Sequence, residues 1–268
     1  MTRRLLLLLL AAFLANAAAA QPLEIHSKHF IKGYPIGTPA SNDLIIRDLY
    51  AMSSNDRTKF ADWVAYRLTP VTVSGSSGER NWEVDPWLDD DETLEPGDYE
   101  GAFVALNTHR GHQAPLAALN GTGHAHQTNY LSNITPQKGP LNSGSWQVME
   151  SRIRALLEDK VFGEVYVMTG PLYEEEMPDL PGADETHRVP SGYWKIVAVP
   201  GEHSLQTAAF IMDQNTPRSS PVMDYLVSID EVEQRSGLDF FWELGEHRQN
   251  RLEGGMGRDW AARWFSGQ

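Results

Sequence analysis

The chain has 268 residues, a formal net charge of −14 at pH 7 and no cysteine. Without cysteine there are no disulfide bonds, so folding depends on burial of apolar side chains, and a chain of this length can bury enough of them. The acidic excess also argues against general electrostatic attraction to nucleic acid or to an anionic membrane. Binding of a polyanionic substrate therefore requires a local cationic cluster or a metal ion.

The first twenty residues predict a secretory signal peptide. Arg3 and Arg4 precede an apolar run from Leu5 to Leu14, and the small residues Ala18–Ala20 follow. This order is typical of a signal peptide, and the apolar run is shorter than the roughly 20 residues of a membrane span. We expect cleavage after Ala20 and export of residues 21–268 as one domain, because no linker or repeat divides them. Loss of two arginines lowers the formal charge from −14 to −16.

The rest of the chain predicts a mixture of strands and helices. The three- and four-residue spacing of apolar side chains from Trp146 to Leu157 predicts an amphipathic helix, with Asn142 and Ser143 available to cap its start. A second helix is expected from Ser228 to Ser236. Because strands and helices do not alternate regularly, we expect an α+β fold. The predicted strands are Asp43–Ile46, Trp63–Leu68, Val165–Met168, Tyr193–Val199 and Ala208–Met212, and the segment Ser74–Gly78 is predicted to be a loop.

Three further segments are given structural interpretations. The acidic block Asp85–Glu100 lacks the ligand order of an EF-hand calcium loop, so a solvated loop is expected. Asn133-Ile134-Thr135 has the spacing of a glycosylation site, but this short motif is frequent by chance and we attach no function to it. The aromatic residues of Gly254–Gln268 are expected to pack on the core, because large aromatic side chains left in water are a liability.

The segment Asn107–Ala117, NTHRGHQAPLA, gathers two histidines, an arginine and a glycine. It follows the short apolar run Phe103–Leu106, so the sequence from His109 to His112 is expected near the end of a strand. Gly111 relaxes the backbone there, and Pro115 is expected to prevent a helix from starting.

Thirty residues after His112, Asn142 is expected to open the amphipathic helix. Glu150 is then about 80° around the helix from Asn142, and Arg154 lies one turn beyond Glu150. If the strand that carries His112 is followed by a loop, a second strand and this helix, His112 can face Asn142. A neutral imidazole opposite an oxygen ligand suits hydrolysis assisted by a hard metal ion.

Each of these residues also has an ordinary structural interpretation when it is taken alone. His112 could be a hydrogen-bonded structural histidine, and Arg110 a surface charge. Asn142 could be only a helix cap, and Glu150 and Arg154 an i,i+4 ion pair.

A rival interpretation is a zinc hydrolase. It uses the spacings His-x-x-His and His-x-His of His109, His112, His124 and His126. The sequence lacks a His-Glu-x-x-His helix, and Gly123 beside His124 indicates a loop, so this interpretation is the weaker one.

Several segments in order resemble the DNA/RNA non-specific endonuclease family, and together they extend over most of residues 21–268. The central one is Arg110-Gly111-His112-Gln113-Ala114-Pro115-Leu116-Ala117, followed by Asn129 to Gln137 and by Leu141-Asn142. The others are Lys59–Tyr66, Arg80-Asn81-Trp82, Thr169–Glu174 and Asp213–Pro217. A lone Arg-Gly-His would be weak evidence, but the ordered set is specific.

The resemblance implies a central antiparallel sheet layered with helices and an active site built as a ββα-metal finger. It implies that His112 is the general base and that Asn142 is the single protein ligand of a hydrated Mg²⁺, with Mn²⁺ as a substitute. Glu150 corresponds to a carboxylate that holds metal-bound water.

Three arginines complete the site that the resemblance implies. Arg80 and Arg110 correspond to guanidinium groups that offset charge in the transition state, and Arg154 corresponds to a phosphate contact. The implied activity is hydrolysis of DNA and RNA, single- or double-stranded, to 5′-phosphorylated oligonucleotides by a secreted enzyme without a membrane partner. Homodimers occur in the family, but the sequence shows no interface.

One residue departs from the family pattern, which most often has aspartate where this chain has His109. Histidine cannot supply the negative charge of aspartate. Because the implied base, ligand and arginines all remain, we expect the change to be tolerated. The alternative is a catalytically impaired relative that binds nucleic acid without cutting it.

Overall fold

The computed structural model describes residues 22–267 except 77 and 203. The predicted signal peptide, residues 1–20, lies outside the described residues. Within the described part, no helix is long and apolar enough to cross a membrane.

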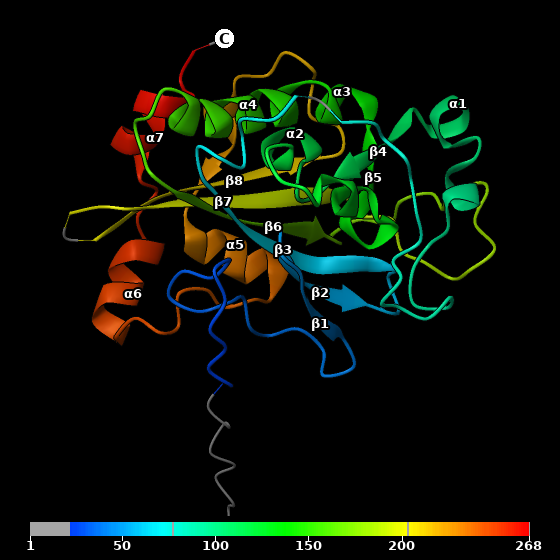
Figure 1. Cartoon of the computed structure of the whole chain (residues 1–268), viewed down its shortest axis with the longest axis horizontal. Helices are drawn as coiled ribbons and strands as arrows, with labels where there is room; N and C mark the ends of the chain where they lie inside the picture. Colours follow the sequence, from blue (N-terminus) through cyan, green and yellow to red (C-terminus); the bar gives the residue numbers. More distant parts are fainter. Residues whose placement is uncertain (1–21, 77, 203, 268) are drawn as a thin grey trace, which may run out of the picture.

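A seven-stranded sheet in the order β1-β2-β3-β6-β7-β8-β9 forms the centre of the molecule (Figure 1). Each strand pairs antiparallel with its neighbours, which confirms the expected α+β class with an antiparallel sheet. The five strands expected from the sequence are present. The strand β2 was not predicted, because three of the five residues in its sequence AMSSN are polar although every residue in it is buried. The strands are β1 Asp43–Ile46, β2 Ala51–Asn55, β3 Phe60–Leu68, β6 Val165–Leu172, β7 Gly192–Pro200, β8 Leu205–Asp213 and β9 Leu226–Val227.

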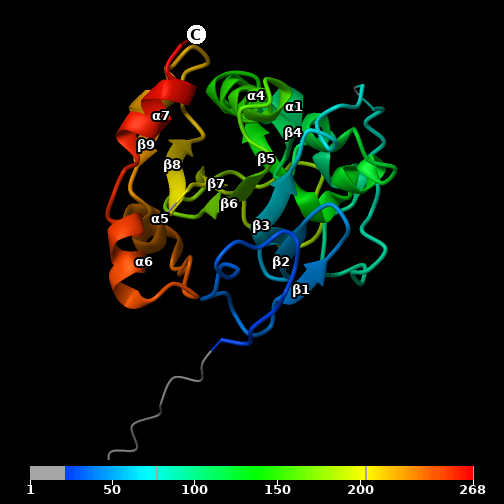
Figure 2. The same ribbon diagram turned by 60° about the vertical axis from the view of Figure 1, so that its left-hand side comes forward.

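Helices cover both faces of this sheet (Figures 1 and 2). The helices α4 (Ser145–Glu158) and α7 (Arg258–Phe265) lie on one face, and α5 (Ile229–Ser236) and α6 (Glu246–Glu253) lie on the other. Because β7 is buried on both faces, its sequence is a nearly continuous apolar run. The expected packing of the C-terminal aromatic residues is confirmed, since the ring of Phe265 lies 5.0 Å from that of Phe210 in β8.

A smaller hairpin stands beside the main sheet and carries the histidine cluster. It pairs β4 (Thr108–His112) with β5 (Ile134–Lys138), and the short helix α3 (Gly139–Asn142) follows β5 directly. Two apolar clusters secure this region, the α4 face of the main sheet and a smaller group that includes Phe60, Leu131 and Ile134. This β-β-α order matches the expected finger in its backbone.

The expectation that His109–His112 lies near the end of a strand is confirmed by β4, although the preceding run Phe103–Leu106 is helical, within α1 (Ala102–Leu106). Two other expectations about this region were wrong. Pro115 does not prevent a helix but precedes α2 (Leu116–Leu119), because proline is well tolerated where a helix begins. Asn142 does not open the long helix: it ends α3, and α4 starts three residues later after Gly144.

The acidic block Asp85–Glu100 is only partly the solvated loop that was expected. Asp89, Asp90 and Asp91 are exposed, but Asp85 is completely buried, where its carboxylate pairs with Arg47. A buried carboxylate is stable only with such a partner, so Asp85 acts as an internal anchor of this loop. The block also contains the short 3₁₀ helix η1 (Pro96–Tyr99); the described part of the chain has three more, η2 (Ala125–Asn129), η3 (Leu131–Asn133) and η4 (Val222–Tyr225).

Candidate active site

The strand β4 presents the proposed catalytic side chains next to an aromatic ring. Strand alternation directs Arg110 and His112 to the same side, where both meet Trp82. The His112 ring lies 5.3 Å from the Trp82 ring, and the Arg110 guanidinium lies 5.7 Å from it. Trp82 therefore packs against both side chains and adds no charge to the site.

The protonation state of His112 is set by its surroundings. Its Nε2 lies 3.0 Å from Oδ1 of Asn129, and Nδ2 of Asn129 donates to the carbonyl oxygen of Glu79 at 3.0 Å. Because the bond to Glu79 fixes which end of the amide faces the ring, Nε2–H is the donor to Oδ1. Nδ1 then carries the lone pair of a neutral imidazole. Burial lowers the pKa of His112 to about 4, with a smaller opposing effect from Asn129 and a further lowering by Arg80.

The two arginines beside His112 differ in how firmly they are held. Arg110 is partly buried, donates from Nη2 to the carbonyl oxygen of Pro96 at 2.7 Å and lies 4.9 Å from the ring of Tyr99. Burial is the main cause that lowers its pKa. Arg80 is exposed, and among the described residues it makes no hydrogen bond or ion pair. Arg110 is thus fixed in place, whereas Arg80 is free to meet a phosphate group.

Asn142 contacts a different histidine from the one that the sequence suggested. Its Nδ2 lies 3.2 Å from Nδ1 of His109, while His112 bonds to Asn129. Asn142 is only partly buried, and its Oδ1 accepts no hydrogen bond from the described residues. This oxygen is therefore available to a ligand.

Glu150 lies on α4, above the central sheet. Its Oε1 is 3.3 Å from Nζ of Lys195, a fully buried lysine of β7. The sequence allowed an i,i+4 ion pair between Glu150 and Arg154. In the structure Arg154 donates to Ser151 Oγ at 3.0 Å, and Glu150 pairs with Lys195. Burial lowers the pKa of Lys195, and the carboxylate of Glu150 opposes that effect.

The chain segment between β4 and β5 is held in place by hydrogen bonds of Asn133. This side chain is completely buried, accepts from the backbone nitrogen of Ala114 at 2.9 Å and donates to the carbonyl oxygens of Ala114 and Thr128 at 3.0 and 2.8 Å. All its polar atoms are occupied inside the fold, so the Asn-Ile-Thr motif has a structural role here.

The four histidines of the zinc interpretation do not meet in one site. Within the described residues, every group of three or more side chains able to hold a metal consists of carboxylates. His124 and His126 are exposed, with ring centroids 6.4 Å apart. The geometry therefore gives no support to a multi-histidine zinc site.

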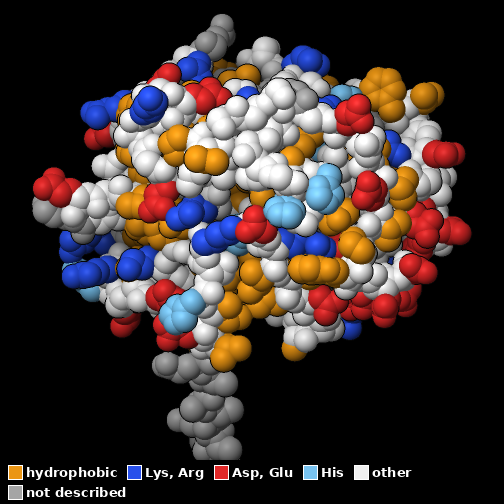
Figure 3. Space-filling view, in the orientation of Figure 1, with side chains coloured by type: hydrophobic (Ala, Val, Ile, Leu, Met, Phe, Trp, Pro, Cys, Tyr) orange, Lys and Arg blue, Asp and Glu red, His pale blue; other side chains and the backbone are white. Residues whose placement is uncertain are grey.

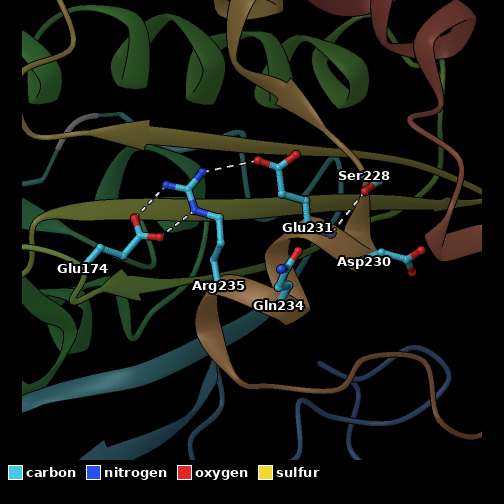
Figure 4. A pocket seen from close by; sticks show the side chains of 6 residues that line it. All are labelled: Glu174, Ser228, Asp230, Glu231, Gln234 and Arg235. Carbon is cyan, nitrogen blue, oxygen red and sulfur yellow. Dashed lines mark hydrogen bonds and ion pairs between the residues drawn. The ribbon is translucent and has the colours of Figure 1, made fainter.

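A separate hollow of about 670 Å³ lies beside α5 and is lined by none of the candidate residues (Figure 4). Its main feature is Arg235, which lies 2.7 Å from Glu174 and 3.4 Å from Glu231. The pair with Glu174 joins α5 to the segment after β6, whereas the pair with Glu231 lies within α5. On the face shown in Figure 3, acidic side chains gather along the right-hand edge, and Lys and Arg side chains gather toward the left.

Comparison with known proteins decides the family. The sequence pattern of the DNA/RNA non-specific endonuclease family matches residues 25–246. The chain belongs to this family of nucleases. It is 43% identical over 249 residues to a nuclease of Serratia marcescens, a match that covers 92% of each chain. It is also 31% identical over 228 residues to nuclease C1 of Cunninghamella echinulata var. echinulata, covering 78% of this chain and 86% of that one.

Two more distant proteins also match this chain. Human mitochondrial endonuclease G is 29% identical over 226 residues, covering 76% of this chain and 71% of its own. The crystal structure of the EndoG/EndoGI complex matches with a TM-score of 0.67 and 24% identity, covering 80% of this chain and 91% of that one, which supports the fold. Membership identifies the protein as a nucleic-acid hydrolase, and members of this family use a divalent metal ion.

The donor chemistry of Asn142 on α3 and of Glu150 on α4 suits a hard, hydrated divalent ion. Asn142 offers an amide oxygen that accepts no hydrogen bond from the described residues, and Glu150 offers a carboxylate that is partly exposed. Magnesium prefers oxygen ligands and keeps several of its waters, so few protein ligands suffice.

Sequence reasoning missed three residues that organise the site: Trp82, Asn129 and Lys195. Trp82 and Asn129 lie in segments that resemble the family, but nothing in the sequence alone indicated their contacts with His112. The only signal for Lys195 was a single charge inside an apolar strand.

Proposed function

We propose that this protein is a secreted endonuclease that hydrolyses phosphodiester bonds of both DNA and RNA and releases 5′-phosphorylated oligonucleotides. The observation that carries this proposal is the environment of His112, a neutral imidazole whose Nε2 is committed to Asn129 and whose Nδ1 has no hydrogen-bond partner among the described residues. An unprotonated ring nitrogen of this kind can accept a proton from water.

In the proposed reaction, Nδ1 of His112 takes a proton from a water molecule whose oxygen attacks the phosphorus. The bond between phosphorus and the 3′ oxygen breaks, the phosphate stays on the 5′ end, and the 3′ oxygen leaves as a hydroxyl after taking a proton from solvent. The hydrogen bond to Asn129 fixes the tautomer of neutral His112 so that Nδ1 carries no proton before the transfer, and the imidazolium formed by the transfer then releases its Nδ1 proton to solvent.

Arg80, Arg110 and Arg154 bind phosphate oxygens and offset the charge that develops on them. Arginine suits this role because its planar guanidinium stays charged and matches phosphate geometry. Phosphate contacts carry no base-sequence information, which is consistent with cleavage of any sequence and of both sugars.

Asn142 is the proposed direct ligand of Mg²⁺, or of Mn²⁺ as a substitute, and Glu150 holds water bound to that ion. When bound, the ion would supply positive charge that stabilises the negative charge developing on the phosphate and on the departing oxygen. The protein's part is to present the free Oδ1 of Asn142 and to hold the Glu150 carboxylate against Lys195.

The alternative of a catalytically impaired binding relative rests on the replacement of aspartate by His109. The contact of His109 with Asn142 shows that this position still touches the proposed metal ligand, which favours an active enzyme. Export is part of the proposal because of the signal-peptide pattern of residues 1–20. N-terminal sequencing of protein from the culture medium tests the cleavage point.

The function is tested by incubating the purified chain from residue 21 with supercoiled plasmid and with RNA, in Mg²⁺ and in EDTA. We expect cleavage of both substrates in Mg²⁺, none in EDTA, and 5′-phosphate ends that accept ligation without added kinase. Binding of either polymer without cleavage would establish the alternative.

A further inference from the structure

His109 lies against the proposed metal ligand. Its Nδ1 is 3.2 Å from Nδ2 of Asn142 and 3.5 Å from Oγ of Ser143. Both partners come from the end of α3, whereas His109 comes from the start of β4, so this contact joins the two halves of the finger.

The ring of His109 is held on two other sides. It lies 5.4 Å from the ring of Phe103 on α1. On the other side it approaches Gly139 so closely that a Cβ there would stand 3.0 Å from Nε2 of His109 and 2.9 Å from Oδ1 of Asn107. A side chain at residue 139 would push the ring away, so glycine permits the contact with Asn142.

The contact determines which end of the Asn142 amide is held against His109 and which end is left for a ligand. A side-chain amide has a donor end and an acceptor end, and only the oxygen end binds a cation. With Nδ1 of His109 as acceptor, Nδ2 is the end of the Asn142 amide that is held against β4, and Oδ1 accepts no hydrogen bond from the described residues.

We propose that His109 is a positioning residue: it fixes the amide of Asn142 by accepting a hydrogen bond at Nδ1, so that Oδ1 is presented to the metal ion. This inference rests on the proposed function, which makes Asn142 the metal ligand. It explains why the chain tolerates histidine where the family usually has aspartate, since both side chains offer an acceptor to the amide.

The test separates the acceptor from the ring. His109→Leu removes the acceptor, whereas His109→Asn keeps a carbonyl oxygen near the place of Nδ1. Mn²⁺ affinity is measured by isothermal titration calorimetry on the chain from residue 21 without nucleic acid, with Asn142→Ala as the reference for loss of the ligand. Thermal unfolding checks that each variant is folded, and the side-chain amide signals of Asn142 in ¹⁵N NMR report its environment directly.

We expect His109→Leu to weaken Mn²⁺ binding about 10-fold or more, in line with the usual effect of removing a group that orients a metal ligand. His109→Asn and His109→Asp should stay within about threefold of wild type, and in His109→Leu alone the Asn142 amide signals should shift or broaden.

Three other outcomes would overturn the inference. Wild-type affinity in His109→Leu, with loss in Asn142→Ala, would show that His109 does not position the ligand while the proposed function stands. Equal loss in His109→Leu and His109→Asn would assign the effect to ring packing rather than to the acceptor. Unchanged affinity in Asn142→Ala would remove Asn142 as the ligand and with it both the metal assignment and the inference.

Discussion

Lys195 of β7 places its ammonium nitrogen 3.3 Å from Oε1 of Glu150, and no part of the lysine side chain is exposed. The same nitrogen lies 3.4 Å from the hydroxyl of Tyr66 and 4.6 Å from the centre of the Trp146 ring. The central sheet thus carries one fully buried cation whose carboxylate partner is a proposed site residue. Burial of a charge is tolerated only with such a partner, so the fold and the site depend on the same ion pair.

Removal of the two partners should have unequal effects on stability. Glu150→Leu leaves the ammonium buried and unpaired, and we expect a loss of about 3–5 kcal/mol in the free energy of unfolding. Lys195→Met should cost less, because the side chain of Glu150 is 14% exposed and reaches water. The double variant should be more stable than Glu150→Leu alone. Urea unfolding at pH 7 of the four proteins checks this, and strictly additive losses would contradict a coupled pair.

The lowered pKa of His112 predicts how stability depends on pH. The pKa falls from 6.5 to about 4 on folding, so between these values the unfolded chain binds more protons at this residue than the folded protein does. Stability therefore decreases as the pH falls through this window and is not affected by His112 above it. In urea unfolding at pH 7 and pH 4.5, His112→Ala should lose less stability between the two pH values than wild type. An equal loss would mean that His112 is not held in the neutral form.

Asn129 should act on catalysis through His112. Asn129→Ala removes the acceptor of the Nε2 proton, so the tautomer and the ring orientation are no longer fixed. We expect kcat to fall about 10- to 100-fold, by analogy with other groups that orient active-site histidines. Asn250→Ala, an exposed change on α6, is the control. A variant with unchanged kcat would show that the bond to Asn129 has no catalytic role.

Substitution of Arg80 should affect catalysis alone, whereas substitution of Arg110 should affect both catalysis and stability. Arg80→Ala should lower kcat/KM by a factor of about 100 without changing stability, and Arg80→Lys should restore only part of it because an ammonium lacks the planar fork. Arg110→Ala should also lower unfolding free energy by about 1 kcal/mol, since it loses the hydrogen bond to Pro96. Steady-state kinetics and urea unfolding of the three variants decide this. Equal stability losses in Arg80→Ala and Arg110→Ala would be inconsistent with their different burial.

The sequence predicted the central sheet well because apolar runs such as Val165–Met168 and Tyr193–Val199 are buried on both faces. It failed at β2, whose Ser53 and Ser54 are polar but buried, and at Asn142, which ends a four-residue helix that no periodicity can reveal. The expected helix Ser228–Ser236 is present as α5, where Ser228 accepts from the backbone nitrogen of Glu231 at 3.1 Å, but the cap expected from Asn142 or Ser143 is absent because α4 starts after Gly144.

For the candidate site, the sequence suggested residues but not the contacts that they make. The family resemblance suggested His112, Arg110, Asn142 and Glu150 as site residues, and all of them except Glu150 lie in the segments quoted for that resemblance. Their partners could not be predicted, since the contacts of His112 with Asn129, of Asn142 with His109 and of Glu150 with Lys195 join elements that are far apart in the sequence. Such pairs depend on register and on strand order, which the sequence does not specify residue by residue.

The central claim is that His112 is the base of a metal-dependent nuclease. The most direct measurement compares the turnover of plasmid DNA and of RNA by wild type, His112→Ala and His124→Ala in saturating Mg²⁺, where His124 is an exposed histidine outside the site. We predict that His112→Ala loses turnover on both substrates by a factor of about 100 or more, while His124→Ala matches wild type. Undiminished cleavage by His112→Ala would contradict the account.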